Sequence, residues 1–256
     1  MTGALDLEGM LRRLHLPTVR RLYGELIPRA EAEGMSYRAF LEILFAEEIA
    51  HRAQTRITRS LRKARFPFLR TIEDFDFTFQ TAVRLQMLGT LLGPELVAEG
   101  RSAIFSGPPG RGKTHLVVAI SYRAIQNGFE ARFTTADELI GELSHAALAG
   151  RLEEALEPYV HPHVLAIDEL GYQSYAADAA NVLFRVVSLR HLKRKSTLVT
   201  TNKPLAALGQ VLHDPDLVEA TLDRLLERGT HFVLRGRSYR TRHHKEDFTA
   251  ATEETA

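Results

Sequence analysis

Cysteine is absent from this chain of 256 residues. The absence excludes disulfide bonds, thiolate metal sites and thiol catalysis, and it fits a reducing compartment such as the cytosol. Long hydrophobic runs are also lacking, since no uncharged apolar stretch approaches the roughly 18 residues of a membrane span. Charges spread through the first thirty residues argue against a signal peptide. We therefore expect a cytoplasmic protein without a membrane partner.

Neither sign of charge dominates, because 33 Lys and Arg residues stand against 32 Asp and Glu residues. This balance argues against a uniformly basic nucleic-acid binder, and the contents of apolar (45%) and charged (25%) residues argue against a disordered chain. Acidic residues are nevertheless missing between Ile49 and Ile72. The basic residues in this interval are Arg52, Arg56, Arg59, Arg62, Lys63, Arg65 and Arg70. A local contact with a polyanion therefore stays open.

The pattern of apolar residues changes at the sequence Phe66-Pro67-Phe68. Before it, helical spacing predicts a small helical domain, with Ser36 as the N-cap of a long helix that runs through Arg62. Proline disfavours helix at the preceding residue, so we place a linker there. After the linker, short apolar strands alternate with amphipathic helices, which is typical of an α/β domain with a parallel sheet.

These changes predict the divisions of the chain. The helical domain covers residues 1–66, the linker 67–79, the α/β domain 80–245 and a frayed tail 246–256. Strands are expected at residues 103–106, 131–134, 164–168, 197–201 and 232–234. The linker is rich in phenylalanine, and we expect its rings to dock on the α/β domain rather than stack on bases. These rings are Phe66, Phe68, Phe75, Phe77 and Phe79.

A complete G-x-x-x-x-G-K-[ST] phosphate-binding loop follows the first of these strands and precedes an apolar-periodic helix. In such a loop, backbone N–H groups turn toward the phosphates and the helix presents its positive end to them. Lys113 is expected to contact the β- and γ-phosphates of ATP, and Thr114 to ligate Mg²⁺. A glycine-rich turn without a ligand is the alternative. The predicted nucleotide-binding residues are Gly107, Pro108, Pro109, Gly110, Arg111, Gly112, Lys113, Thr114 and His115.

Two further strands end in polar residues that suit ATP hydrolysis. Residues 164–167 are apolar and lead to Asp168 and Glu169. Nucleotides bind at the carboxyl edge of a parallel sheet, so we expect Asp168 in the Mg²⁺ shell and Glu169 as the base that polarises the attacking water. A solvated turn is the alternative for this pair. Asn202, after the strand at 197–201, is expected to hold the water or sense the γ-phosphate, although it is also a typical turn residue.

With these motifs the sequence resembles the IstB-like insertion-sequence transposition helpers, which are related to DnaC-type helicase loaders and more distantly to DnaA. The resemblance runs from about Ala64 to Arg240 and covers most of the chain. Besides the phosphate-binding loop, it is carried by Ala64-Arg65-Phe66-Pro67, residues 71–77, residues 167–171, Thr200-Thr201-Asn202, Asp223-Arg224-Leu225 and Gly236-Arg237-Ser238-Tyr239-Arg240. The combination is specific, whereas the first thirty residues contribute little.

The resemblance implies an AAA+ P-loop core, in which helices flank a central parallel sheet, after a small all-helical N-terminal domain. It implies that Asn202 is sensor 1, that Arg224 is an arginine finger donated to a neighbouring subunit, and that Arg240 is sensor 2 of its own subunit. It also implies a Mg²⁺-dependent ATPase that forms a ring or helical homo-oligomer on duplex DNA. This assembly would recruit and stimulate a cognate transposase.

Three other functions stay open at this point. A DnaC-like replicative helicase loader shares the core motifs, and the N-terminal domain does not reveal which partner it touches. A small-molecule kinase also uses a phosphate-binding loop and Mg²⁺, but it lacks the Asp-Glu pair, the sensor asparagine and the trans arginine. A non-hydrolysing DNA-binding module would use the nucleotide only as a ligand.

Two basic clusters are candidates for contact with DNA. The first recurs at intervals of four, three and four residues, which places it on one helical face, and it comprises Arg52, Arg56, Arg59 and Lys63. With no acid among them these charges repel one another, which a polyanion would relieve; a solvated face is the alternative. The second cluster comprises Arg190, Lys193, Arg194 and Lys195. We expect it to face DNA or a neighbouring subunit; the alternative is a solvated helix end, where the helix dipole also favours cations.

Overall fold

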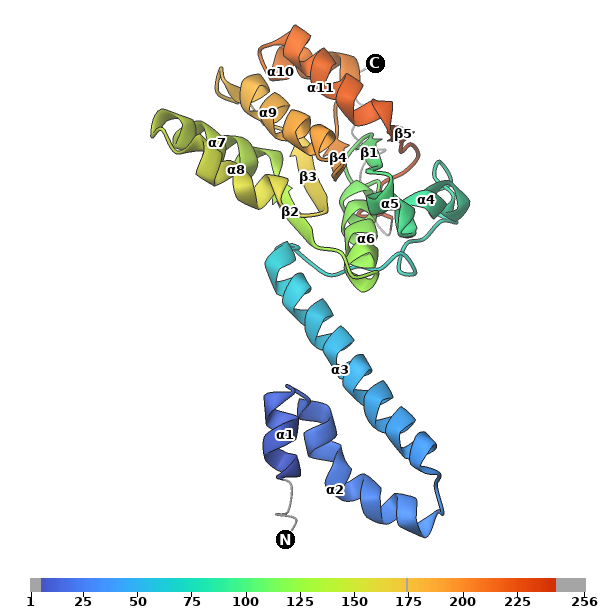
Figure 1. Cartoon of the computed structure of the whole chain (residues 1–256). Helices are drawn as coiled ribbons and strands as arrows, with labels where there is room; N and C mark the ends of the chain where they lie inside the picture. Colours follow the sequence, from blue (N-terminus) through green and yellow to red (C-terminus); the bar gives the residue numbers. More distant parts are fainter. Residues whose placement is uncertain (1–5, 174, 243–256) are drawn as a thin grey trace. The chain divides into compact units, whose positions relative to one another are not determined.

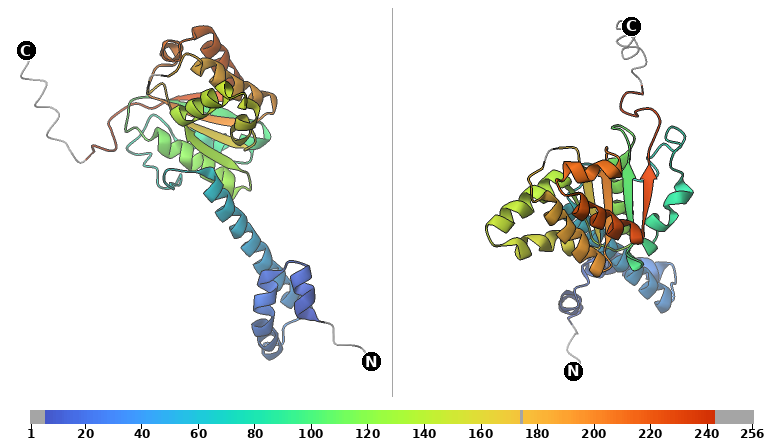
Figure 2. Two further views of the ribbon diagram at one scale, coloured as in Figure 1. Left: turned by 90° about the vertical axis from the view of Figure 1, so that its left-hand side faces the viewer. Right: turned by 90° about the horizontal axis from the view of Figure 1, so that it is seen from above.

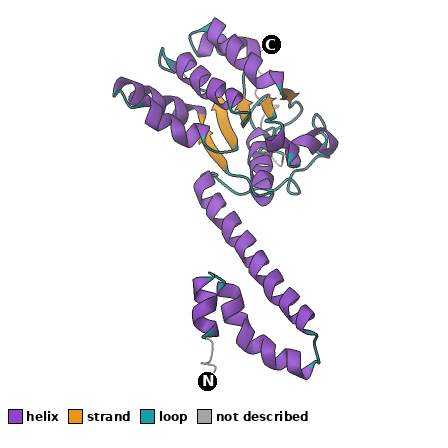
Figure 3. Ribbon diagram, viewed as in Figure 1, coloured by secondary structure: helices purple, strands orange, loops and turns teal. Residues whose placement is uncertain are grey.

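A parallel sheet of five strands forms the centre of the larger part of the chain (Figures 1 and 3). The computed structural model describes residues 6–173 and 175–242, so the predicted tail 246–256 lies outside the described residues. The strand order is β2-β3-β4-β1-β5, and each neighbouring pair is parallel. The strands are β1 (Ser102–Ser106), β2 (Ala131–Thr135), β3 (Val164–Leu170), β4 (Ser196–Thr201) and β5 (Gly229–Val233). The predicted parallel sheet is confirmed.

Only β5 departs clearly from its predicted range, since it begins at Gly229 rather than at Phe232. This strand lies at one edge of the sheet, beside β1. Thr230 and His231 in its first half are exposed. An edge strand with exposed polar residues lacks the continuous apolar run that predicts a buried strand, so sequence periodicity underestimates its length.

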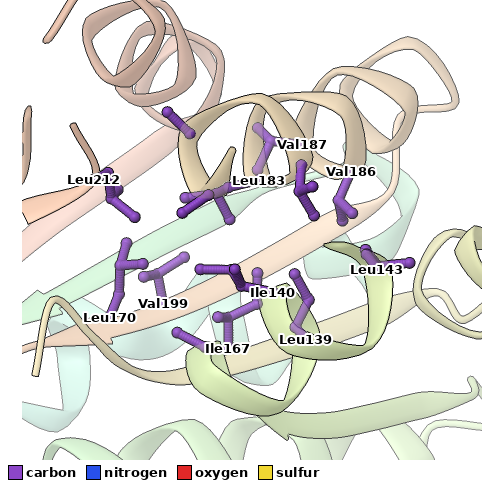
Figure 4. Close-up of a cluster of buried hydrophobic side chains, with 14 of the residues drawn as sticks. Leu139, Ile140, Leu143, Ile167, Leu170, Leu183, Val186, Val187, Val199 and Leu212 are labelled. Atoms are coloured by element: carbon purple, nitrogen blue, oxygen red, sulfur yellow. The ribbon is translucent and has the colours of Figure 1, made fainter. Parts of the chain in front are cut away.

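Helices cover both faces of the sheet (Figure 2). The connection from β1 to β2 runs in the opposite direction to the later connections, so right-handed crossovers place α6 (Lys113–Gln126) on the other face from the helices that follow it. Ile167 and Val199 of the sheet pack with Leu139 and Leu183 in one buried cluster on that second face (Figure 4). Its helices are α7 (Ala136–Leu148), α8 (Leu152–Val160), α9 (Ala179–Leu192), α10 (Leu208–Val211) and α11 (Pro215–Glu227).

The remaining short helices flank the ends of strands. Before β1 lie η1 (Leu85–Leu88), α4 (Gly89–Leu92) and α5 (Glu95–Ala98), and after β4 lies η2 (Leu205–Ala207). Because all strands run in one direction, their carboxyl ends meet at a single edge of the sheet. The polar residues at the carboxyl ends of β1, β3 and β4 therefore come together at this edge, where open parallel sheets bind ligands.

The chain divides into two compact units, Met1–Arg59 and Ser60–Ala256. The first unit is helical, and its helices are α1 (Leu7–Arg13), α2 (Pro17–Ala32) and most of α3 (Tyr37–Ala64). Its small core contains Leu11, Val19 and Leu44. The Ser36 hydroxyl accepts the N–H of Ala39 at 3.2 Å, which confirms the predicted N-cap. In the described part of the chain, neither α3 nor any other helix is both long and apolar enough to cross a bilayer.

Glu48 on α3 is buried and caps the start of α2. Its carboxylate accepts the backbone N–H groups of Thr18 (2.8 Å) and Val19 (3.3 Å), and it also accepts Arg52 Nε at 2.8 Å. Arg52 donates a further hydrogen bond to the carbonyl of His15. The expectation that the first basic cluster has no acidic partner is therefore wrong for Arg52. Its partner Glu48 lies just outside the interval that lacks acidic residues. Arg52 contributes to the fold of the helical unit.

The hydrogen bonds of Glu48 make the stability of this unit sensitive to acid. Burial raises the pKa of Glu48, but the hydrogen bonds from Arg52, Thr18 and Val19 outweigh burial, and the net pKa is lowered. A lowered folded-state pKa stabilises the unit above the pKa of the unfolded chain, and this contribution is lost as pH falls through the folded-state value.

We expect Glu48→Gln to lower the free energy of unfolding by about 1–3 kcal/mol at neutral pH. The deficit should shrink as pH falls, because the wild-type carboxylate becomes protonated as well. Urea titrations followed by circular dichroism between neutral and acidic pH measure this difference. Glu42→Gln, which alters an exposed pair with Arg38, is the matched control and should cost little. A Glu48→Gln deficit that stays constant with pH would contradict the assignment.

Arg190 on α9 is fully buried, so the expected external role of the second basic cluster is wrong for this residue. Its guanidinium donates five hydrogen bonds, and the acceptors are the carbonyls of Tyr159, Pro162, His163 and Ser196 and the hydroxyl of Thr197. Burial lowers its pKa to about 9, which leaves the group charged at neutral pH. The acceptors lie in the last turn of α8, in the segment between α8 and β3, and at the start of β4, so Arg190 joins these elements at the edge of the sheet opposite the phosphate-binding loop.

Candidate functional site

The phosphate-binding loop lies between β1 and α6, and its backbone requires glycine. Gly107 has φ +139°, and a Cβ atom there would lie 2.2 Å from the carbonyl oxygen of Leu234. Gly112 has φ +87°, and a Cβ atom there would lie 2.6 Å from the ring of Phe75. Any other residue at either position would clash and would also strain the backbone. The loop is therefore fixed between the segment after β5 and the linker.

Lys113, the first residue of α6, places its ammonium group inside the loop. Its Nζ donates to the carbonyls of Gly107 (2.7 Å) and Pro108 (2.9 Å). Burial lowers the pKa of Lys113, while the nearby Asp168 carboxylate acts in the opposite direction. A half-buried cation enclosed by loop backbone is suited to bind phosphate oxygens, which would replace the two carbonyls as its partners.

Asp168 and Thr114 form the candidate Mg²⁺ site. The Thr114 hydroxyl lies 3.1 Å and 3.0 Å from the two carboxylate oxygens of Asp168, which is only 5% exposed. The Thr200 hydroxyl donates to the same carboxylate at 2.5 Å from the neighbouring strand β4. Mg²⁺ prefers oxygen ligands and takes few of them from the protein, so this pair fits the ion.

Glu169 and Asn202 lie at the ends of the neighbouring strands β3 and β4 and both line the same pocket. Glu169 is exposed, which leaves its carboxylate available to a water molecule. The Oδ1 atom of Asn202 is buried and has no hydrogen-bond partner among residues 6–173 and 175–242. A buried acceptor without a partner is costly, so the Asn202 side chain would gain a hydrogen bond by turning Oδ1 into the pocket that the residue lines.

One cavity of about 660 Å³ brings most of the predicted site residues together. Those that line it are Pro109, Gly110, Arg111, Gly112, Lys113, Thr114, His115, Glu169, Asn202 and Arg240. Arg224 on α11 does not belong to this lining. It is partly buried, with its guanidinium 4.6 Å from the centre of the Phe184 ring and a hydrogen bond of 2.8 Å to the carbonyl of Ala220. The structure therefore separates Arg224 from the pocket of its own chain.

The linker forms part of the pocket wall, which sequence reasoning missed. Phe68, Arg70 and Asp74 line the cavity. The linker docks on the loop through His115, whose Nε2 lies 2.9 Å from the carbonyl oxygen of Thr71 and whose ring meets Phe75 edge-on at 5.2 Å. The predicted docking of the linker rings is confirmed for Phe75 and Phe79, whereas Phe68 is exposed. The family-like motif at residues 71–77 was the available signal, but it did not show which residues face the nucleotide.

The segment after β5 also forms part of the wall of this pocket. The N–H of Tyr239 donates to the carbonyl of Gly110 at 2.9 Å, and the Tyr239 ring meets Phe79 of the linker at 5.3 Å. Tyr239 and Arg242 join Arg240 in lining the cavity. These two residues were not predicted as site residues, although Tyr239 belongs to the motif that included Arg240. The linker and the C-terminal segment together hold the loop from both sides.

The first basic cluster divides into two kinds of residue in the structure. Lys63 lies 3.9 Å from the carboxylate of Glu130, and Arg52 is paired as described above. Arg56 and Arg59 are exposed, and neither forms a hydrogen bond or an ion pair with any residue in the described ranges. Of the four residues, Arg56 and Arg59 therefore offer their charges most freely to an external partner.

Comparison with known proteins identifies relatives of the whole chain. The family model described as IstB-like ATP binding protein matches residues 9–247. A protein of insertion sequence IS5376 from Geobacillus stearothermophilus is 36% identical over 90% of this chain and 91% of its own length. A protein of insertion sequence IS21 from Pseudomonas aeruginosa is 34% identical over 92% of this chain and 88% of its own length. The names of both relatives assign ATP binding to them.

Solved structures show the same fold at lower identity. The structure of DnaI is 20% identical, with a TM-score of 0.56 over 68% of this chain and 93% of that chain. AMPPCP-bound DnaA from Aquifex aeolicus is 19% identical, with a TM-score of 0.55 over 70% of this chain and 54% of that chain. These likenesses agree with the central parallel sheet and place the larger unit in the AAA+ P-loop fold. By its sequence, the chain belongs to the IstB-like ATP-binding protein family.

Proposed function

We propose that this protein is a Mg²⁺-dependent ATPase that assembles as a homo-oligomer on duplex DNA and recruits and stimulates a transposase. The observation that supports the ATPase activity is the convergence of Lys113, Glu169 and Asn202 on one pocket, beside the Thr114–Asp168 pair. Nucleotide binding alone does not require a carboxylate and an amide side chain in the pocket. In hydrolysis a carboxylate can accept a proton from the attacking water and an amide can orient that water.

Each residue has a distinct task in the proposed reaction. Lys113 binds the β- and γ-phosphate oxygens of ATP, and the loop N–H groups surround them. Glu169 accepts a proton from the water that attacks the γ-phosphorus, while Asn202 orients this water through its Oδ1 atom. Thr114 and Asp168 would hold Mg²⁺, which neutralises phosphate charge when bound. Arg240 adds a cation at the pocket wall.

Removal of the loop cation tests the nucleotide site itself. We expect Lys113→Ala to abolish ATP binding or nearly so, because the phosphates lose their cation inside the loop. Titration with a fluorescent ATP analogue measures the affinity directly. Lys193→Ala removes an exposed lysine at the end of α9 and is the matched control, which should bind as wild type does. Undiminished affinity of Lys113→Ala would remove the basis of the assignment.

The proposed DNA contact rests on Arg56 and Arg59 and on the kind of relatives that the chain has. Both guanidinium groups are exposed on α3 without an acidic neighbour in the described structure, so a phosphate backbone would relieve their mutual repulsion. The relatives are named as proteins of insertion sequences, elements that move as DNA. Arg52 is a poor choice for a test, because its loss would also disturb Glu48 and the helical unit.

We expect the double variant Arg56→Ala/Arg59→Ala to bind duplex DNA more weakly and with a flatter salt dependence. The slope of log affinity against log salt should fall by about 0.9 for each phosphate contact that is lost. Fluorescence anisotropy at several salt concentrations gives both quantities. Arg13→Ala/Arg21→Ala removes the same charge from the same unit outside the cluster and is the control. An unchanged slope together with lost binding of a protein partner would make this surface a protein interface instead.

The transposition role and the helicase-loader role differ in their partners. The likeness to DnaI and DnaA is one of fold alone, and it does not favour a loader. The relatives at 36% and 34% identity are insertion-sequence proteins, which favours transposition. If a transposase gene lies beside the gene of this protein, a pull-down with that transposase as one bait and a replicative helicase as the second bait separates the two roles. Capture of the helicase alone would support the loader.

A further inference from the structure

The backbone at Glu169 has an unusual conformation for a residue other than glycine. Its φ is +61°, in the left-handed region that costs free energy for an L side chain. β3 continues past this point to Leu170, and its pairing with β4 is irregular between Ile167 and Leu170. Such a conformation persists only where the surrounding structure imposes it, so the neighbours of Glu169 show what holds it.

Hydrogen bonds hold the peptide groups on both sides of Glu169. Its N–H donates to the hydroxyl of Thr200 on β4 at 3.0 Å. Its carbonyl accepts the hydroxyl of Tyr175 at 3.3 Å and the N–H of Tyr172 at 3.2 Å. The Tyr175 hydroxyl also accepts the N–H of Gly171 at 3.0 Å, so one side chain joins both ends of the turn that follows Glu169.

Both supporting side chains are inside the protein. Thr200 is 1% exposed and Tyr175 is 9% exposed. Burial raises the pKa of Tyr175, which keeps its hydroxyl protonated and able to donate to Glu169. Neither hydroxyl can exchange its partner readily for water, so these bonds constrain the backbone more than solvated ones would.

We propose that Thr200 and Tyr175 are positioning residues that fix the backbone of Glu169 so that its carboxylate faces the attacking water. The inference rests on the proposed ATP hydrolysis with Glu169 as base. If the residue relaxed to an ordinary conformation, the direction in which the side chain leaves the backbone would change, and the carboxylate would move away from the water position. Thr200 also donates to Asp168, so it ties the base to the metal-binding carboxylate.

Tyr175 gives the cleaner test, because it is not among the residues that line the pocket. We expect Tyr175→Phe to lower kcat roughly 10- to 100-fold while the affinity for ATP stays unchanged, since only the geometry of the base is lost. Tyr159→Phe is the matched control. It removes a buried tyrosine hydroxyl that donates to Glu142 at 2.5 Å, away from the pocket, and it should keep kcat.

A double-mutant cycle separates positioning from general destabilisation. In a Glu169→Gln background Tyr175→Phe should have no further effect on kcat, because its role acts through the base that is already missing. Thr200→Ser, which keeps the hydroxyl, should retain turnover that Thr200→Val loses. If a thermal melt shows that Tyr175→Phe fails to fold, the comparison of Thr200→Ser with Thr200→Val still tests the positioning role.

The outcomes distinguish this inference from the proposed function. A wild-type protein that does not hydrolyse ATP with Mg²⁺ and DNA present would overturn both. Wild-type turnover with an unchanged kcat in folded Tyr175→Phe and in Thr200→Val would overturn the positioning role alone. Equal losses from Tyr175→Phe with and without Glu169→Gln would also overturn it, because they would show an effect that bypasses Glu169.

Discussion

An Arg224→Ala protein should bind ATP about as well as wild type and hydrolyse it about 10³ to 10⁵ times more slowly. Arg224 does not line the pocket of its own chain, where Lys113, Thr114 and Asp168 remain intact. An arginine finger that acts in trans is inserted beside the γ-phosphate by a neighbouring subunit, where it offsets the charge of the transition state. Nucleotide titration and phosphate-release assays on the variant measure the two quantities separately.

Mixing experiments decide whether Arg224 acts in trans. We expect Arg224→Ala and Glu169→Gln proteins to be inactive for different reasons. In a mixed head-to-tail assembly, some interfaces would pair an intact Glu169 with an intact Arg224. At equal amounts, with free exchange and independent sites, about a quarter of the interfaces are wild type. Activity should therefore recover in part. If co-assembled proteins show only the sum of their separate activities, Arg224 is not a trans finger.

If Arg224 is not the arginine finger, Arg228 and Arg240 are the next candidates for this role. Arg228, near the end of α11, donates to the carbonyl of His191 and is partly buried. Arg240 lines the pocket of its own chain, which suits a sensor acting in cis better than a finger. Arg224 itself rests on the Phe184 ring, so it would have to leave this ring, or the ring would have to lie at the subunit interface.

Glu169→Gln should leave ATP binding intact and slow hydrolysis by roughly two to four orders of magnitude. The amide has nearly the same shape as the carboxylate but cannot take a proton from the attacking water. Because Thr200 and Tyr175 hold the backbone of Glu169 and not its side chain, the substitution should not disturb the turn. Single-turnover hydrolysis and equilibrium titration measure the two effects.

Glu154→Gln on α8 removes an exposed carboxylate of the same kind and is the control for this experiment. It should hydrolyse ATP at the native rate. A Glu169→Gln protein that also hydrolyses ATP at the native rate would place the general base elsewhere in the pocket.

Local patterns allowed the sheet and the phosphate-binding edge to be predicted. Residues 103–105 of β1 and 164–167 of β3 are continuously apolar because these strands are buried, whereas β4 is equally buried but has only Leu198 and Val199 as apolar residues. Asp168 and Glu169 directly follow the apolar run of β3 and Asn202 follows β4, so their meeting at one edge follows from the parallel topology. The edge strand β5 was predicted with a wrong start because its exposed residues carry no such pattern.

Contacts between distant segments were beyond prediction. Glu48 caps α2 only because α2 and α3 pack together, whereas its pair with Arg52 is a contact between positions i and i+4 of α3 that helical spacing already offered. From the sequence alone, Arg190 is expected to be a surface charge. In the structure it is buried, and backbone carbonyls of α8, of the segment before β3 and of β4 accept its hydrogen bonds. The linker and the segment after β5 are far apart in the sequence, yet the structure brings both into contact with the phosphate-binding loop or the start of α6. The spacing of residues along the sequence does not reveal such contacts.

ATP turnover by the purified protein, with and without duplex DNA and with Mg²⁺ present or chelated, tests the central claim most directly. The account predicts phosphate release that requires Mg²⁺, rises when DNA allows assembly, and falls by roughly two to four orders of magnitude in Glu169→Gln. A protein that binds ATP but releases no phosphate under any of these conditions would contradict it.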